Sequence, residues 1–182
     1  MDTKIDIYDK DENPLKLTAT YDEVRRKGLW ARAVHIILYT PSKKVLMQKR
    51  STKLDYHPGE IEVSVGGGVK AGETTILAIL REVREETGIR LREKDLTYIG
   101  KKKFSRRYSQ NGHKYYMKDF IYSYSAQIPD DIEIKPEDNE AQQIFLLPIK
   151  DVKRAIRKHY VLHFGKLASM YGYWLYLLKA VD

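Results

Sequence analysis

The chain of 182 residues carries 33 Lys and Arg against 25 Asp and Glu, which gives a formal net charge of +8. Hydrophobic residues make up 42% and charged residues 32%, a composition typical of globular proteins that excludes a largely disordered chain. The absence of cysteine excludes disulfides, thiolate metal sites and a cysteine nucleophile. The sequence contains no run of 18 apolar residues, so no transmembrane helix is predicted.

This length suits one domain with a substantial core, so we predict a single domain over residues 1–182. Within it we distinguish an N-terminal extension, residues 1–30, and C-terminal helices in residues 150–182. No signal-peptide pattern opens the chain, so we expect a cytoplasmic protein that does not bind membranes. The positive charge favours anionic partners, either phosphate-bearing small molecules or nucleic acid.

The N-terminal extension is predicted to form two short strands and a short helix. The strands are expected at Ile5–Tyr8 and Leu15–Thr18. Thr20 and Glu23 have the spacing of a capping box, and Gly28 is placed to end the helix that follows.

The next segment is predicted to form a hairpin followed by a glycine turn. Its strands are expected at Ala31–Tyr39, which is largely apolar, and at Val45–Arg50. A loop over 51–62 then leads to a short strand, Val63–Val65, and to the glycines at 66–68. Glycines allow a close approach of a ligand to the backbone.

An amphipathic helix is predicted directly after these glycines. Thr74 or Thr75 is expected to cap its start, and Gly88 its end. Its core-facing residues recur at helical spacing and are Ile76, Ile79, Leu80 and Val83.

Three glutamates of this helix, Glu82, Glu85 and Glu86, stand at i, i+3 and i+4, so we expect their carboxylates to converge. The repulsion between them is a few tenths of a kcal/mol per pair when exposed. It rises to roughly 3 kcal/mol in a partly buried cleft, and a bound divalent cation removes it. Hard oxygen ligands favour Mg²⁺, Mn²⁺ or Ca²⁺ over zinc. For the three glutamates taken alone, a solvated acidic helix face is the favoured interpretation.

The rest of the chain is predicted to add strands and two helices. The strands are expected at Leu96–Tyr108, His113–Ile128 and Ile144–Leu147, with Asn111-Gly112 as a hairpin turn. The helices are expected at Pro148–His159 and Lys166–Ala180. The last helix carries an apolar stripe that we assign to the core, with a homodimer surface as the alternative; it comprises Leu167, Met170, Tyr171, Trp174, Leu177 and Leu178.

Charge is distributed unevenly along the second half of the chain. Lys101–Lys118 holds seven Lys or Arg and no acid, whereas Pro129–Glu140 holds six acids and one Lys. The basic segment suits phosphate binding, and a solvated surface accounts for it as well.

The spacing around the acidic helix resembles the Nudix box, G-x5-E-x7-R-E-U-x-E-E-x-G-U, where U is aliphatic. Gly67 and Glu73 open the pattern, and Arg81–Ile89 completes it at every defined position. The resemblance implies an α+β fold, a Nudix-type α/β/α sandwich with a mixed β-sheet. It also implies a hydrolase that uses Mg²⁺ or Mn²⁺ to cleave a nucleoside diphosphate linked to another moiety.

The resemblance also assigns roles to individual residues. Glu82, Glu85 and Glu86 would ligate the metal with the carbonyl of Gly67, Arg81 would orient a ligating carboxylate, and Glu73 would support the loop or complete the site through water. The catalytic residues would then include Arg81 and a general base, for which Glu85 and Glu140 are the candidates.

Residues outside the box are assigned from their position. Lys49 and Arg50 end a strand shortly before the box and are predicted to hold the phosphates of the substrate. Tyr115, Tyr116 and Phe120 could stack a base, although core packing is the commoner role of such residues. His35 has no partner spacing that suggests catalysis and is assigned a structural role.

Two other functions are compatible with parts of the sequence. Gln48–Ser51 and the Pro58-Gly59-Glu60 segment resemble a Nudix subgroup similar to isopentenyl-diphosphate isomerase, but that isomerase needs a cysteine where Gly66 stands, so we reject isomerisation. The other alternative is a non-catalytic Nudix module that binds a nucleotide or RNA. Because no box carboxylate is missing, we favour an enzyme acting on a small nucleotide or diphosphate over a nucleic-acid binder.

Overall fold

The computed structural model describes residues 3–53, 58–110, 112–137, 141–158 and 171–181. The strands are β1 (Lys4–Tyr8), β2 (Pro14–Thr20), β3 (Ala31–Tyr39), β4 (Lys44–Arg50), β5 (Ile61–Val63), β6 (Val65–Gly68), β7 (Thr97–Gln110), β8 (His113–Gln127) and β9 (Ala141–Pro148). The helices are α1 (Tyr21–Lys27), α2 (Thr75–Thr87), α3 (Ile149–Lys158) and α4 (Tyr171–Lys179), with a 3₁₀ turn at Glu93–Asp95. None of the helices in these ranges is long and apolar enough to cross a membrane.

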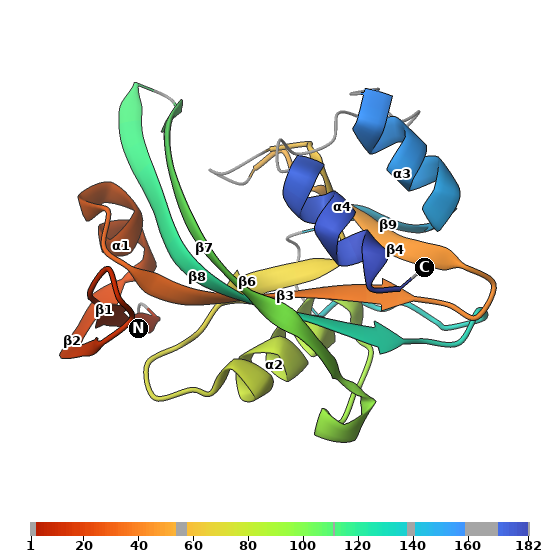
Figure 1. The fold of residues 1–182 in the computed structure, drawn as a ribbon, viewed down its shortest axis with the longest axis horizontal. Coiled ribbons are helices and arrows are strands. Elements are labelled where there is room, and N and C mark those ends of the chain that lie inside the picture. The colour runs from red at the N-terminus through yellow and green to blue at the C-terminus, as the bar shows by residue number, and fades with distance from the viewer. Residues whose placement is uncertain (1–2, 54–57, 111, 138–140, 159–170, 182) are drawn as a thin grey trace.

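The main sheet is mixed, with the strand order β5-β4-β3-β8-β7. β3 runs parallel to β8 over its whole length, from Ala31 opposite Asp119 to Tyr39 opposite Gln127. β6 pairs antiparallel with β3, and β9 pairs antiparallel with β4. The helix α2 lies on one side of this sheet and α3 and α4 lie on the other (Figure 1). The protein therefore has the expected α+β sandwich with a mixed sheet.

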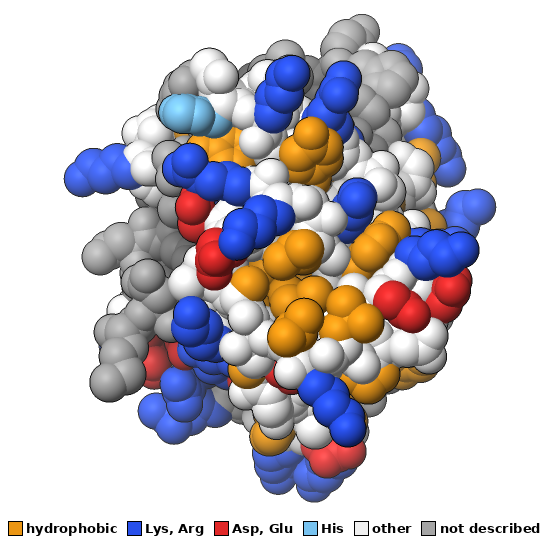
Figure 2. Space-filling model, turned by 90° about the vertical axis from the view of Figure 1, so that its left-hand side faces the viewer, with side chains coloured by type: hydrophobic (Ala, Val, Ile, Leu, Met, Phe, Trp, Pro, Cys, Tyr) orange, Lys and Arg blue, Asp and Glu red, His pale blue; other side chains and the backbone are white. Residues whose placement is uncertain are grey.

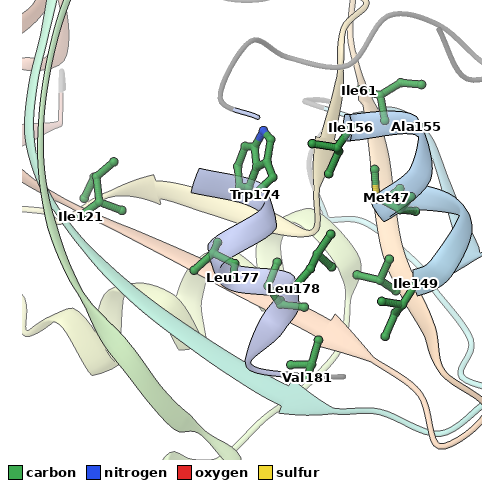
Figure 3. Close-up of a cluster of buried hydrophobic side chains, with 14 residues drawn as sticks. Met47, Ile61, Ile121, Ile149, Ala155, Ile156, Trp174, Leu177, Leu178 and Val181 are labelled. Atoms are coloured by element: carbon green, nitrogen blue, oxygen red, sulfur yellow. The ribbon is translucent and has the colours of Figure 1, made fainter. Parts of the chain in front are cut away.

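Alternate residues of β3 enter two separate hydrophobic clusters. Ala33 and Ile37 pack with α3 and α4, whereas Val34, Ile36 and Leu38 pack with α2. In the first cluster Trp174, Leu177 and Leu178 of α4 are at most 3% exposed, which confirms the core assignment for these three residues (Figure 3). Leu167 and Met170 of the predicted stripe lie outside the described residues.

The predicted strand Val63–Val65 is wrong in its bounds, because Ser64 separates β5 from β6. Ser64 has a φ of 56°, in the left-handed region, which breaks the extended backbone. Its side chain takes over the local hydrogen bonding: Ser64 Oγ donates to the Leu46 carbonyl at 2.8 Å and accepts from the Leu38 N–H at 2.9 Å. The chain thereby leaves the edge beside β4 and continues beside β3.

The N-terminal extension forms β1, β2 and α1, as predicted. Thr20 and Glu23 form the capping box of α1, and Gly28 ends the helix with a φ of 65°. β1 and β2 make a separate two-stranded sheet, and Ile5, Ile7 and Val24 build a third hydrophobic cluster with Ala19 and Ala31. The extension therefore packs at the start of β3, close to the end of the sheet that carries β6.

Gly88 ends α2 at a position where both the backbone conformation and the lack of space require glycine. Its φ is 74°, and an added Cβ would lie 2.2 Å from the Lys135 carbonyl oxygen. Gly88→Ala is expected to lower the free energy of unfolding by about 2 kcal/mol or more, since the left-handed conformation costs about 1–2 kcal/mol and the clash adds to it. Gly72→Ala is the control, because Gly72 has a φ of 76° but open space around it. Denaturant unfolding that shows equal losses for both variants would contradict the clash.

Candidate functional site

The acidic side chains are positioned by β6 and by the start of α2. Gly67 lies opposite Val34 of β3, and the chain then turns into α2, where the Thr74 side chain caps the helix by accepting from the Leu77 N–H. A Cβ on Gly67 would lie 2.1 Å from Glu82 Oε1. The bare glycine backbone therefore allows β6 to lie directly against the carboxylate of Glu82.

Arg81 is the centre of a hydrogen-bond network at this point. Its Nε and Nη2 donate to the two carboxylate oxygens of Glu73, each at 2.9 Å. Its Nη1 donates to Glu82 at 2.7 Å and to Glu85 at 3.2 Å, and its Nη2 also donates to the Gly68 carbonyl at 3.0 Å. The planar guanidinium fork thus fixes three carboxylates relative to the glycine strand.

Glu73 is held in its ionised form by this network. Burial acts to raise the pKa of Glu73, but hydrogen bonds from the Arg81 side chain and the Lys70 backbone N–H outweigh it and lower the pKa below its usual value. The Lys70 N–H lies 3.0 Å from Glu73 Oε2. Glu73 therefore ties the loop between β6 and α2 to the helix.

The three glutamates of α2 do not converge as the spacing predicts. Glu82 and Glu85 share Arg81 and line a pocket, whereas Glu86 is 3% exposed and accepts a hydrogen bond from Gln48 Nε2 at 2.5 Å. The reason is the helix geometry. Positions 85 and 86 lie on either side of position 82 around the helix, and position 86 is on the side that faces β4.

The pocket has a volume of about 530 Å³ and lies between the glycine strand, α1, β8 and α4. Its polar lining includes Glu82, Glu85, Arg81 and Arg50. Arg50 donates from Nη1 to Glu62 at 3.1 Å, and both side chains are less than 20% exposed. The pocket lining as described does not include Lys49, and Glu140 lies outside the described residues.

Lys70 is a pocket residue that the sequence analysis did not single out. It lines the pocket from the loop between β6 and α2, and its charge is one of the causes that lower the pKa of Glu73. Its position within the five-residue spacer after Gly67 was the available signal, because any residue of that loop lies next to the acidic helix. Lys70 is thus better placed than Lys49 to meet an anionic ligand.

His35 also lines the pocket, on the side of α4. Its Nδ1 lies 2.9 Å from the hydroxyl of Tyr173, its ring stacks on Trp174, and the Tyr173 hydroxyl also lies 2.9 Å from Ser123 Oγ. Burial, with a smaller effect of the Arg50 charge, lowers the pKa of His35 to about 4, so its imidazole is neutral at physiological pH. These contacts agree with the structural assignment of His35.

The oxygen donors of the site suit a hard divalent cation. Glu82 and Glu85 present carboxylates to the pocket, and the missing side chain of Gly67 lets the Glu82 carboxylate lie against the glycine backbone. The described ranges contain no preassembled group of three acidic or histidine ligands. The contacts explain this, because Arg81 Nη1 bridges Glu82 and Glu85 while Glu86 faces Gln48. A cation would compete with Arg81 for the two carboxylates.

The basic hairpin of β7 and β8 is largely engaged with the N-terminal extension and with aromatic rings. Lys101 pairs with Glu12, Lys102 lies over the ring of Tyr176, and Lys103 lies over Trp30. The face that holds the hairpin and the extension shows basic side chains around a group of hydrophobic ones (Figure 2). These contacts favour the surface interpretation of the first part of the basic segment.

Comparisons with known proteins bear on the family and the fold of this chain. Residues 29–164 match the family model described as NUDIX domain. An uncharacterized Nudix hydrolase of Yersinia pestis is 33% identical over 85 residues, which is 47% of this chain and 46% of that protein. The crystal structure of DR0079 from Deinococcus radiodurans has a TM-score of 0.67 at 17% identity and covers 97% of this chain and 98% of that one. The NUDIX domain of Shewanella oneidensis NrtR, complexed with ADP ribose, has a TM-score of 0.58 at 16% identity, covering 90% and 99%.

Proposed function

This chain belongs to the Nudix domain family, and on that basis we propose that it hydrolyses the diphosphate linkage of a nucleoside diphosphate joined to another moiety, with Mg²⁺ or Mn²⁺ as cofactor. The observation that carries the proposal is the pocket lined by Glu82, Glu85 and Arg81 beneath the glycine strand. A pocket of about 530 Å³ is large enough for a mononucleotide-sized ligand.

Each residue of the network has a distinct task in this proposal. Glu82 and Glu85 would hold the cation, with the Gly67 carbonyl beside them, and Glu86 would add a carboxylate from the Gln48 side. When bound, the cation neutralises phosphate charge and acidifies a water molecule. Arg81 orients the carboxylates, since its guanidinium already fixes Glu82 and Glu85, and Glu73 holds Arg81 in place.

The proton of the attacking water goes to a carboxylate, and two candidates remain. Glu85 is 31% exposed in its side chain and lines the pocket, so it can accept a proton from a bound water. Glu140 is the other candidate and stays a prediction from the sequence.

A substrate panel tests the function directly. ADP-ribose, nucleoside triphosphates, dinucleoside polyphosphates and capped RNA should be incubated with Mg²⁺ or Mn²⁺, and the products separated by chromatography. We expect metal-dependent cleavage of at least one compound at its diphosphate linkage, abolished by EDTA and restored by the metal. Binding of a nucleotide without any cleavage would instead identify a non-catalytic module.

Lys70 is expected to bind the phosphates of the substrate. Lys70→Met should raise KM roughly tenfold, because a charge-assisted hydrogen bond to phosphate is lost, and should leave kcat less affected. The salt dependence of KM should also weaken. Lys94→Met, at an exposed position in the 3₁₀ turn, is the matched control. Equal KM values for the two variants would show that Lys70 does not contact the substrate.

A further inference from the structure

His35 uses only one of its two ring nitrogens within the protein. Its Nδ1 lies 2.9 Å from the Tyr173 hydroxyl, which also lies 2.9 Å from Ser123 Oγ. Its Nε2 has no hydrogen-bond partner in the part of the chain that the structure describes. Trp174 Nε1 is a polar atom that is buried without such a partner, but His35 Nε2 is not buried to that degree. Because His35 lines the pocket, Nε2 can contact a ligand there.

The edge of the imidazole that carries Nε2 lies against the glycine strand β6. A Cβ on Gly66 would lie 2.3 Å from His35 Cδ2 and 2.9 Å from His35 Nε2, whereas a Cβ on Gly67 would meet the Glu82 carboxylate. Successive residues of a strand face opposite sides, so His35 and Glu82 lie on opposite sides of β6. Both line the same pocket, which therefore extends past the glycine strand to the imidazole.

The hydroxyl groups of Ser123 and Tyr173 determine which nitrogen of His35 carries the proton. Ser123 is fully buried, and its hydroxyl contacts only Tyr173 within the described ranges, so its O–H donates to Tyr173. The Tyr173 O–H is then directed at His35 Nδ1, which accepts. Burial lowers the pKa of His35 to about 4, so the neutral imidazole has a single proton. That proton is on Nε2, which makes Nε2–H a donor to the pocket.

The charged groups near this donor neutralise each other. Arg50, whose charge also acts on His35, lies 3.1 Å from Glu62, and both side chains line the pocket. A phosphate only accepts hydrogen bonds and would meet the negative charge of Glu62. A sugar hydroxyl is neutral and both accepts and donates, so it matches a neutral N–H donor beside a carboxylate.

We propose that His35 Nε2–H donates a hydrogen bond to a sugar hydroxyl of the ligand, on the opposite side of the glycine strand from Glu82. Tyr173 and Ser123 are positioning residues, because they act by fixing the tautomer of His35. The inference rests on the proposed function, since it places the sugar of a nucleoside diphosphate substrate in the same pocket as Glu82.

The tautomer is tested first, on the 182-residue chain without any ligand. Proton–nitrogen correlation spectra of the protein with isotope-labelled histidine show which ring nitrogen is protonated, and comparison with His35→Phe identifies the signals of His35. We expect the proton on Nε2 at neutral pH. A proton on Nδ1, or one shared between both nitrogens, would overturn the inference.

The ligand contact is tested by recording the same spectra during titrations in EDTA, which prevents hydrolysis. The two probes are ADP-ribose and inorganic pyrophosphate. ADP-ribose should shift the Nε2 signal of His35, whereas pyrophosphate, which has no sugar hydroxyl, should leave it in place. The absence of a shift with ADP-ribose, or an equal shift with pyrophosphate, would overturn the inference.

Variants separate the contact from the packing of the ring. His35→Phe keeps an aromatic ring but removes the donor, so the Kd of ADP-ribose should rise about tenfold. Tyr173→Phe should let both tautomers of His35 form and should raise this Kd about threefold. Tyr176→Phe is the matched control, because its hydroxyl is on the same helix but donates to the Ile99 carbonyl. A His35→Phe variant that is folded by circular dichroism and keeps the Kd of the parent would overturn the inference.

This contact and the hydrolysis can fail separately. A response of His35 to ADP-ribose without metal-dependent cleavage of any compound would leave the inference standing and refute the proposed function. Metal-dependent cleavage with no response of His35 would do the reverse.

Discussion

Glu85→Gln and Glu82→Gln are each expected to lower kcat by about 100-fold or more while the protein remains folded. Each change removes one anionic oxygen from the pocket and nearly preserves the shape of the side chain. Residues that merely support metal ligands typically change affinity or activity about 10–100-fold, so the loss of a ligand should be at least as large. Mn²⁺ binding should weaken together with kcat, measured by titration and by initial rates.

The control for these variants is Glu133→Gln, which removes a charge from an exposed side chain outside the pocket. It should keep the turnover of the parent protein. Full turnover in both Glu82→Gln and Glu85→Gln, with the fold intact, would refute the assignment of these carboxylates as metal ligands.

Glu140→Gln distinguishes the two candidate bases. If Glu140 takes the proton, this variant should lower kcat and leave Mn²⁺ affinity nearly unchanged, because no ligand is lost. Glu85→Gln should weaken both. Full turnover in Glu140→Gln would leave Glu85 as the base.

Local patterns predicted the elements of this fold well, because their causes are local. The capping box of Thr20 and Glu23, the end of α1 at Gly28 and the end of α2 at Gly88 are each decided within a few residues. The hairpin between β7 and β8 was likewise predicted from its turn residues. The strand break at Ser64 was missed, since a serine in the left-handed region has no distinctive signal in a single sequence.

The site was predicted only as far as the box extends. Arg81 meets Glu73, Glu82 and Glu85 because all four belong to one short segment. Arg25 of α1 and Asp119 of β8, which also line the pocket, form an ion pair between residues 94 positions apart. No local pattern encodes such a pairing.

Which basic side chains line the pocket is also decided by tertiary contacts. Lys49 and Arg50 were predicted as phosphate ligands from their place at the end of a strand. In the structure Arg50 pairs with Glu62 from the neighbouring strand β5, and the described lining includes Lys70 instead of Lys49. The ion pair with Glu62 partly neutralises the charge that Arg50 presents to a ligand. This pairing can be recognised only once the order of the strands in the sheet is known.

Gly67→Ala is expected to lower kcat by about 100-fold, an effect comparable to the loss of a carboxylate. An added Cβ would lie 2.1 Å from Glu82 Oε1 and 2.2 Å from Glu82 Cδ, so the carboxylate must move. A displacement of about 1 Å in a catalytic site can cost about 100-fold in rate. Metal binding should weaken as well, because the displaced group is a proposed ligand.

The expected cost in stability is small by comparison. The φ of Gly67 lies outside the left-handed region, and the clashing atoms are the end of a flexible side chain, so overpacking should cost about 1 kcal/mol. Gly68→Ala is the matched control in the same strand, since its Cβ would meet Ile5 at an ordinary 3.4 Å. It should lose far less activity than Gly67→Ala.

A double-mutant cycle tests whether the clash with Glu82 is the cause. Glu82→Asp shortens the side chain by one methylene and withdraws the carboxylate from the added methyl group. The effects of Gly67→Ala and Glu82→Asp on kcat should therefore be less than additive, because residues in direct contact couple. The measurement is kcat for the parent, both single variants and the double variant under saturating metal. Strictly additive effects would show that Gly67 acts through the backbone and not by making room for the carboxylate.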